Sequence, residues 1–190
     1  MKRADELVPI LTGCEWFMDR LRDIAAVEVP DSWIGAGAIR DLVWDERFGD
    51  GFDPENVRDV DVAFFDARDL TAERDAHVED ALLARNPTVR WDAKNQARVH
   101  VWYPERFGVE VEPLQSAADG IATWPEYATC VGARLTPGGT IELAAPHGLD
   151  DLLDGVWRCN PVRVTSDEYG RRLERKNPAT RWPGVRIVAG

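Results

Sequence analysis

The segment Asp59-Val60-Asp61-Val62 constrains the fold of this chain more than any other feature. Side chains alternate along a strand, so the two aspartates share one face while Val60, Val62 and Phe64 point to the other, into a core. Paired carboxylates on an apolar strand are typical of a site for a hard cation such as Mg²⁺, which prefers oxygen ligands and leaves positions for substrate phosphates. The alternative is a structural strand edge protected by charged residues.

A glycine pair, Gly35 and Gly37, precedes an amphipathic helix expected over residues 38–48. A Gly-x-Gly turn lets the backbone approach a ligand closely, and the helix N-terminus that follows is suited to a phosphate. Arg40 lies one turn into this helix. Its planar guanidinium is either a ligand for phosphate oxygens or the partner of a nearby carboxylate such as Asp41 or Asp45.

Gly-x-Gly before a helix, followed by two aspartates on the next apolar strand, resembles the DNA polymerase beta-like nucleotidyltransferase superfamily. The wider sequence is similar to a small bacterial branch of it, the nucleotidyltransferase family proteins, from about residue 30 to the end. Segments 91–100, 119–125, 128–134 and 145–151 carry this likeness. One departure is an acidic insertion, residues 46–58, which separates Gly37 from Asp59 more widely than is usual in the superfamily.

The resemblance implies three carboxylates that bind two Mg²⁺ ions, namely Asp59, Asp61 and Asp92. Two such ions can clamp the attacking and leaving oxygens of an in-line displacement. In the superfamily the third carboxylate, here Asp92, also assists deprotonation of the acceptor hydroxyl. Glu110 and Glu112 are the alternatives for this third position, although a solvated strand face explains them as well.

A polar cluster follows Asp92 and consists of Lys94, Asn95 and Arg98. Within an otherwise apolar region it indicates contacts to the nucleotide or the acceptor, and a polar hairpin turn is the alternative. Together with Gly35, Gly37 and Arg40, these residues form the predicted nucleotide-binding set.

Composition limits the remaining possibilities. The chain has 190 residues, which predicts one domain over 1–160 and a basic helix and tail over 161–190 packed on it. The net charge of −11 argues against broad nucleic-acid binding. The last 30 residues, however, carry seven basic and three acidic side chains, a segment that either contacts a phosphate-bearing substrate or docks on the acidic body. No apolar run is long enough to span a membrane, and three widely spaced cysteines favour the reducing cytoplasm.

Hydrophobic periodicity predicts an α+β (mixed α/β) fold with a mixed sheet flanked by helices and an added C-terminal hairpin and helix. The expected helices cover 5–27, 38–48, 71–85, 149–153 and 166–176. The expected strands cover 32–35, 57–65, 88–93, 97–103, 128–135 and 140–144, with a further candidate at 108–111.

The resulting hypothesis is a Mg²⁺-dependent nucleotidyltransferase that moves a nucleoside monophosphate from an NTP to an acceptor and releases pyrophosphate. A small-molecule acceptor is favoured over a long nucleic acid because the body of the chain is acidic. Two alternatives stay open, a nucleotide-binding or regulatory module without turnover and a metal-dependent phosphohydrolase.

Overall fold

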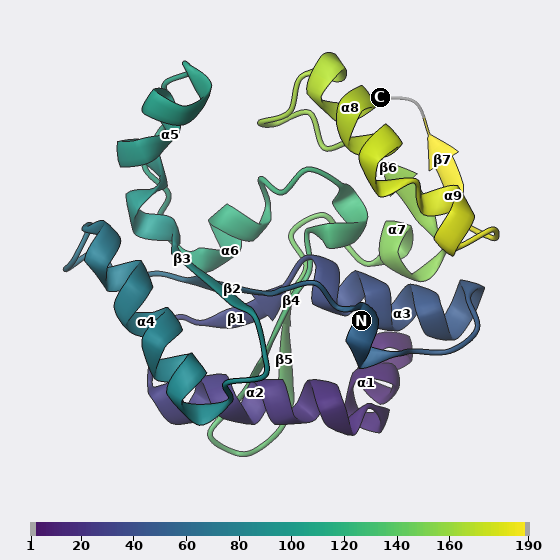
Figure 1. Ribbon diagram of the computed structural model, residues 1–190, viewed down its shortest axis with the longest axis horizontal. Helices are drawn as coiled ribbons and strands as arrows, with labels where there is room; N and C mark the ends of the chain where they lie inside the picture. Colours follow the sequence, from purple (N-terminus) through teal and green to yellow (C-terminus); the bar gives the residue numbers. More distant parts are fainter. Residues whose placement is uncertain (1–2, 189–190) are drawn as a thin grey trace.

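The computed structural model describes residues 3–188 of the chain (Figure 1). Two helices begin it, α1 (Ala4–Gly13) and α2 (Glu15–Val27). The single helix predicted over 5–27 is therefore wrong in one respect, because Cys14 between them is extended, with φ −96° and ψ 102°. The break lets each helix meet a different partner: α1 packs against α3 (Gly37–Phe48), and α2 packs against α4 (Ala72–Arg85) and β4 (Gly132–Leu135).

A five-stranded mixed sheet forms the centre of the fold, in the order β3-β2-β1-β4-β5. The other strands are β1 (Trp33–Gly35), β2 (Val60–Phe64), β3 (Trp91–Asn95) and β5 (Ile141–Ala144). The β2 and β3 strands are parallel, whereas every other neighbouring pair is antiparallel. This architecture confirms the predicted α+β fold with a mixed sheet flanked by helices.

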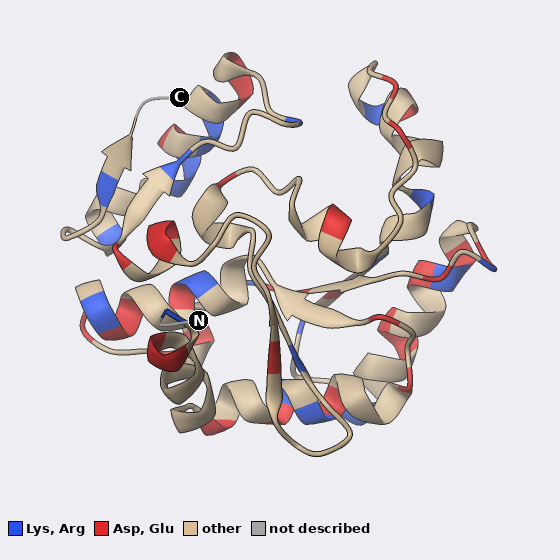
Figure 2. Ribbon diagram, turned by 180° about the vertical axis from the view of Figure 1, so that it is seen from behind, with Lys and Arg blue, Asp and Glu red and all other residues tan. Residues whose placement is uncertain are grey.

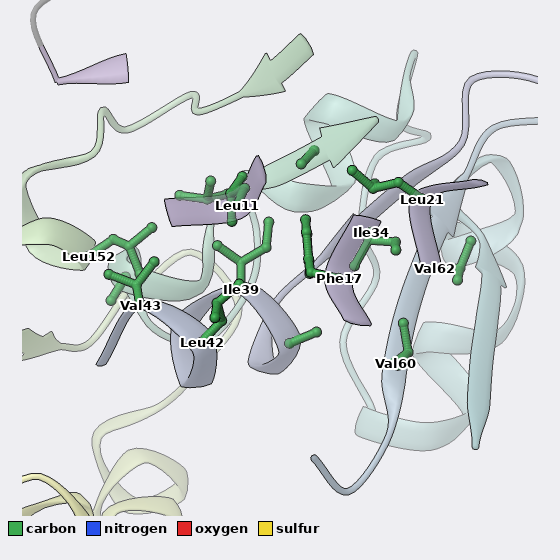
Figure 3. Packing of buried hydrophobic residues seen from close by; sticks show 14 of the residues in the cluster. Leu11, Phe17, Leu21, Ile34, Ile39, Leu42, Val43, Val60, Val62 and Leu152 are labelled. Atoms are coloured by element: carbon green, nitrogen blue, oxygen red, sulfur yellow. The ribbon is translucent and has the colours of Figure 1, made fainter. Parts of the chain in front are cut away.

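The main core lies between this sheet and helices α1 to α4, and Figure 3 shows part of it. Val60 and Val62 are each 1% exposed and pack with Leu11, Phe17 and Ile39 of the surrounding helices. The prediction that the apolar residues of β2 point into a core is therefore confirmed. The opposite face of this strand is left to the aspartates.

The strand predicted over 97–103 is wrong. A 3-10 turn (Gln96–Arg98) leads into the helix α5 (Val99–Phe107), and residues 108–111 form no strand. Val99 and Tyr103, four residues apart, are buried, while Val101 is 53% exposed. This one-sided burial is typical of a helix. The strand β3 therefore pairs only with β2 among the described strands and forms an edge of the sheet.

The C-terminal third adds a second, smaller sheet of two parallel strands, β6 (Val156–Arg158) and β7 (Arg186–Val188), which the sequence did not predict. The last long helix, α8 (Ser166–Lys176), covers the predicted range, and Thr165 caps it through a capping box with Glu168. The remaining short helices are α6 (Ala117–Ile121), α7 (Asp150–Leu153) and α9 (Pro178–Arg181), with 3-10 turns at Pro54–Asn56 and Tyr127–Thr129.

Two parts of the fold rise on the same side of the central sheet, as Figure 1 shows: α5, and the group formed by β6, α8, α9 and β7. The predicted tail ends at residue 190, and its last two residues lie outside the described range. Within residues 3–188 no helix is long and apolar enough to cross a membrane.

Candidate active site

The strand register brings the predicted carboxylates together. Asp61 is paired with Gly35 of β1 on one side and with Asp92 of β3 on the other. Directly opposed residues of neighbouring strands point to the same face, so the carboxylates of Asp61 and Asp92 lie side by side. Asp59 immediately precedes β2 and is close enough for its charge to act on Asp61.

The surroundings of Asp61 oppose its ionisation. Burial is the largest cause, and the charges of Asp59 and Asp92 add to it, so the pKa of Asp61 rises from 3.8 to about 7. A backbone hydrogen bond from Gly37 and the charge of Arg40 act in the opposite direction but are weaker. Clustered carboxylates with a raised pKa are a recognised mark of a functional site.

Asp92 is the one carboxylate of the three that forms a salt bridge within residues 3–188. Its Oδ1 lies 2.7 Å from Lys94 Nζ, which also lies 2.9 Å from Glu79 Oε1. In the described part of the chain, no group of three His, Cys, Asp or Glu side chains is arranged so that it could hold a metal ion. The chemistry of the donors, carboxylate oxygens, is nevertheless the kind that a hard cation prefers.

The glycine turn differs from its expected role in detail. A Cβ on Gly35 would overlap the ring of Trp124 and lie 2.8 Å from the Val131 carbonyl, so packing alone requires glycine there. A Cβ on Gly37 would lie 4.0 Å from Asp61 Oδ2, an ordinary contact. The residue in a glycine-like conformation is Ala36, with φ 51°. Such strain is often found at binding sites, and nucleotide binding by the two glycines stays a prediction.

Arg40 is 4% exposed and is surrounded by the chain itself. Its Nε donates to Asp41 Oδ1 at 2.9 Å, and its guanidinium lies between 5.1 and 5.8 Å from the ring centroids of Trp44, Trp157 and Trp182. The carboxylate pairing considered from the sequence is thus present. From this position the charge of Arg40 also acts on Asp61. Contact between Arg40 and a phosphate stays a prediction.

Two of the predicted binding residues are held by contacts with other parts of the chain. Asn95 is fully buried, donates to the carbonyls of Asp66 and Asp69 at 2.9 and 2.8 Å, and accepts from the N–H groups of Asp66 and Ala97. Arg98 donates to Asp75 Oδ2 at 2.9 Å. These contacts tie the ends of β2 and β3 to α4, so both residues have a structural role.

Asp61 and Asp92 lie in the wall of a cleft of about 560 Å³. One further wall is α5 with Trp102, Tyr103 and Phe107, and the other is formed by α8 and the segment before it. Figure 2 shows basic residues on α8 and in the preceding loop. The sequence contained the signal for this wall, the basic segment after residue 160. The aromatic wall was missed because α5 was expected to be a strand.

A mixed sheet that carries paired aspartates beside a Gly-x-Gly turn and helix defines a class, the polymerase beta-like nucleotidyltransferases. The chain belongs to a nucleotidyltransferase family, whose model matches residues 22–187. This confirms the predicted resemblance and the prediction of a transferase enzyme. No curated protein is detectably similar in sequence.

A solved structure supports the same assignment. A CCA-adding enzyme head domain, determined by NMR, is 29% identical to this chain and superimposes with a TM-score of 0.80. The match covers 98% of this chain and 96% of that chain. The fold is therefore shared over nearly the whole length of both proteins.

Proposed function

We propose that this protein is a Mg²⁺-dependent nucleotidyltransferase that moves a nucleoside monophosphate from an NTP to an acceptor and releases pyrophosphate. One observation carries the proposal. Asp61 is in register with Gly35 and Asp92 across three neighbouring strands, at the wall of a cleft, in a chain of a nucleotidyltransferase family. Nucleotidyl transfer depends on positioning and charge neutralisation more than on covalent participation by the protein, and this arrangement is suited to both.

The residues have distinct roles in this proposal. Asp59, Asp61 and Asp92 would hold the metal, which would neutralise charge on the phosphate oxygens. Burial, and then the charges of Asp59 and Asp92, raise the pKa of Asp61, and a bound cation would favour its ionised form. Gly37 and the N-terminus of α3 face the phosphates. Asp92 accepts the proton of the acceptor hydroxyl, and Lys94 holds its carboxylate until the substrates bind.

The acceptor is proposed to be small, because the cleft volume of about 560 Å³ is that of a pocket for one or two small ligands. The structural relative is a CCA-adding enzyme head domain, so an RNA end belongs in the set of acceptors to be tested. We further propose that residues 161–190 belong functionally to the same domain as residues 1–160, since Arg172 and Arg175 of α8 line the cleft together with Asp61. The cytoplasmic location stays a prediction.

Calorimetric titration with ATP, GTP, CTP and UTP, with and without Mg²⁺, tests the donor site. We expect one nucleotide to bind in a metal-dependent manner to the wild type and to lose most of its affinity in Asp61→Asn. A matched control is Asp80→Asn, which removes the same charge from an exposed position on α4. Pyrophosphate release with a panel of hydroxyl and phosphate acceptors then tests transfer.

Three results would contradict the proposal in different ways. Transfer that survives Asp61→Asn would remove the metal site from the mechanism. Tight NTP binding without pyrophosphate release for any acceptor would indicate a binding module. Release of orthophosphate without an acceptor would indicate a phosphohydrolase.

A further inference from the structure

The cleft continues beyond the carboxylates, into a region to which the proposed reaction assigns no particular part of a substrate. Its walls there are aromatic on α5 and basic on the segment 163–175. The two walls meet where the Tyr103 hydroxyl donates to the carbonyl of Arg163 at 3.1 Å. This contact closes the far end of the cleft, so a ligand seated there would be bounded on two sides.

Arg163 is the most informative residue of this region. Its guanidinium is half-buried and lies 5.1 Å from the centroid of the Tyr103 ring. No carboxylate of residues 3–188 forms a salt bridge with it, and burial lowers its pKa. Removing a cation from water without a negative partner is unfavourable, and an anionic ligand would offset this desolvation penalty.

The charges nearby leave this cation uncompensated. Arg172 is already paired, with Nη2 3.0 Å from Oε2 of the fully buried Glu126. Glu168 also lines the cleft, but its carboxylate accepts from the backbone and hydroxyl of Thr165 at 2.9 and 2.7 Å. Arg175 adds a further cation that forms no salt bridge within the described residues. The hydrogen bonds from Thr165 hold Glu168 in place but leave its charge, so Arg163, Arg172 and Arg175 against Glu168 and Glu126 give this wall a net charge of +1.

The opposite wall is suited to a flat ring. Trp102, Tyr103 and Phe107 lie within 4.5 to 6.3 Å of one another, measured between ring centroids. Phe107 is 45% exposed although it is a large apolar side chain. Tyr103 is buried and faces Arg163. Trp102 and Phe107, which Arg106 flanks, therefore supply the ring surface of this wall. A base or another planar group that stacks on such a ring gains about 1–3 kcal/mol.

We propose that this far part of the cleft, between α5 and Arg163, is the acceptor subsite and that it binds a phosphate ester that carries a planar ring. The phosphate contacts Arg163 and Arg175, and the ring stacks on the aromatic residues of α5. The acceptor is then either a free nucleotide-like molecule or the terminal nucleotide of a short strand. This inference rests on the proposed function, in which the donor occupies the end of the cleft beside Asp61.

Binding of AMP measured by calorimetry in EDTA tests the subsite. Without metal the donor site is not formed, so AMP reports the far end of the cleft. We expect AMP to bind more tightly than adenosine or inorganic phosphate. We expect Arg163→Met, which keeps an unbranched stem but removes the charge, to weaken AMP about 10- to 100-fold, the loss of a charge-assisted contact.

Matched variants separate the subsite from the fold and from the donor site. Arg171→Met removes a charge from the exposed side of α8, outside the cleft, and leaves AMP binding unchanged. Arg163→Lys retains a cation and recovers part of the affinity. Mg²⁺-dependent NTP binding stays intact in Arg163→Met, so failure of the donor site is distinguishable from failure of the acceptor subsite.

An RNA trinucleotide with a 5′-phosphate distinguishes the two sources of the ligand. Tighter binding than AMP identifies a strand end, and equal or weaker binding identifies a free nucleotide. On addition of AMP, the indole N–H resonance of Trp102, assigned through Trp102→Phe, should shift. AMP that binds Arg163→Met as tightly as the wild type, or that binds no better than inorganic phosphate, overturns the proposal.

Discussion

Replacing Asp61 by asparagine should make the metal-free protein more stable, and the gain should grow with pH. The cause is the pKa of Asp61, which burial and the charges of Asp59 and Asp92 raise from 3.8 to about 7. In the unfolded chain the same carboxyl group ionises near pH 4. Between these values the folded state keeps a proton that the unfolded state has released.

The sign of the effect follows from this difference in bound protons. Because the folded state binds more protons between about pH 4 and pH 7, the free energy of unfolding falls as pH rises through that window. A rise from 3.8 to about 7 corresponds to at most about 4 kcal/mol at 1.36 kcal/mol per pH unit. Asparagine does not titrate and can still accept the hydrogen bond from Gly37. The variant therefore does not lose unfolding free energy at this position as the pH rises.

Urea unfolding in EDTA at pH 5, 6, 7 and 8 measures the effect. The part of the stability difference between Asp61→Asn and the wild type that comes from this ionisation should be about 1.6 kcal/mol at pH 5 and reach up to about 4 kcal/mol at pH 8. That value is a shift of about 1–2 M in the urea midpoint. Asp80→Asn, an exposed control, should show no such trend.

Addition of Mg²⁺ provides a second measurement on the same two proteins. A ligand that binds only the folded state stabilises it, so Mg²⁺ at pH 8 should raise the midpoint of the wild type and leave Asp61→Asn nearly unchanged. A stability difference that is the same at pH 5 and pH 8, or a variant that is less stable at pH 8, would refute the electrostatic account of the site.

Three further substitutions test the structural roles around the cleft. Gly35→Ala should lower the unfolding free energy by about 1–3 kcal/mol, because its Cβ would overlap the Trp124 ring; a thermal melt equal to that of the wild type would contradict this packing. Asn95→Ala should cost about 2–4 kcal/mol, since it leaves backbone groups such as those of Asp66 without partners. The NTP affinity of the folded variant should equal that of the wild type. A loss of NTP binding without a loss of stability would show that Asn95 contacts the nucleotide. Cys130→Ala should retain transfer, because burial raises the thiol pKa to about 12 and keeps it protonated, and an inactive but folded variant would contradict this.

The paired aspartates show what local pattern can predict. Alternation along β2 placed Val60 and Val62 in the core and the carboxylates on the other face, and the structure agrees. The same reasoning failed for α5, where alternating apolar residues over 97–103 indicated a strand. Burial of Val99 and Tyr103 against the rest of the fold selects a helix there, and short apolar segments do not distinguish the two by pattern alone.

Neighbours in sequence were a poor guide to neighbours in the cleft. Lys94, Asn95 and Arg98 formed one cluster along the chain, but of the three only Lys94 lines the cleft beside Asp61, while Arg98 lines a neighbouring hollow with Asp92. Asn95 is the last residue of β3, and its side chain donates to the Asp66 carbonyl in the loop after β2. Arg98 pairs with Asp75 of α4. Their separation follows from the 3-10 turn after β3, which directs successive side chains to different sides.

By itself, the sequence determined the apolar face of β2, the carboxylates on its other face, the bounds of α8 and the nucleotidyltransferase resemblance, because each depends on residues close together in the chain. Only the tertiary structure decided that Asp61 lies between Gly35 and Asp92, and that the basic segment around Arg163 faces the aromatic helix α5 across the cleft. These neighbours are separated by 26 to 60 residues, and packing of the whole core, rather than any local periodicity, brings them together.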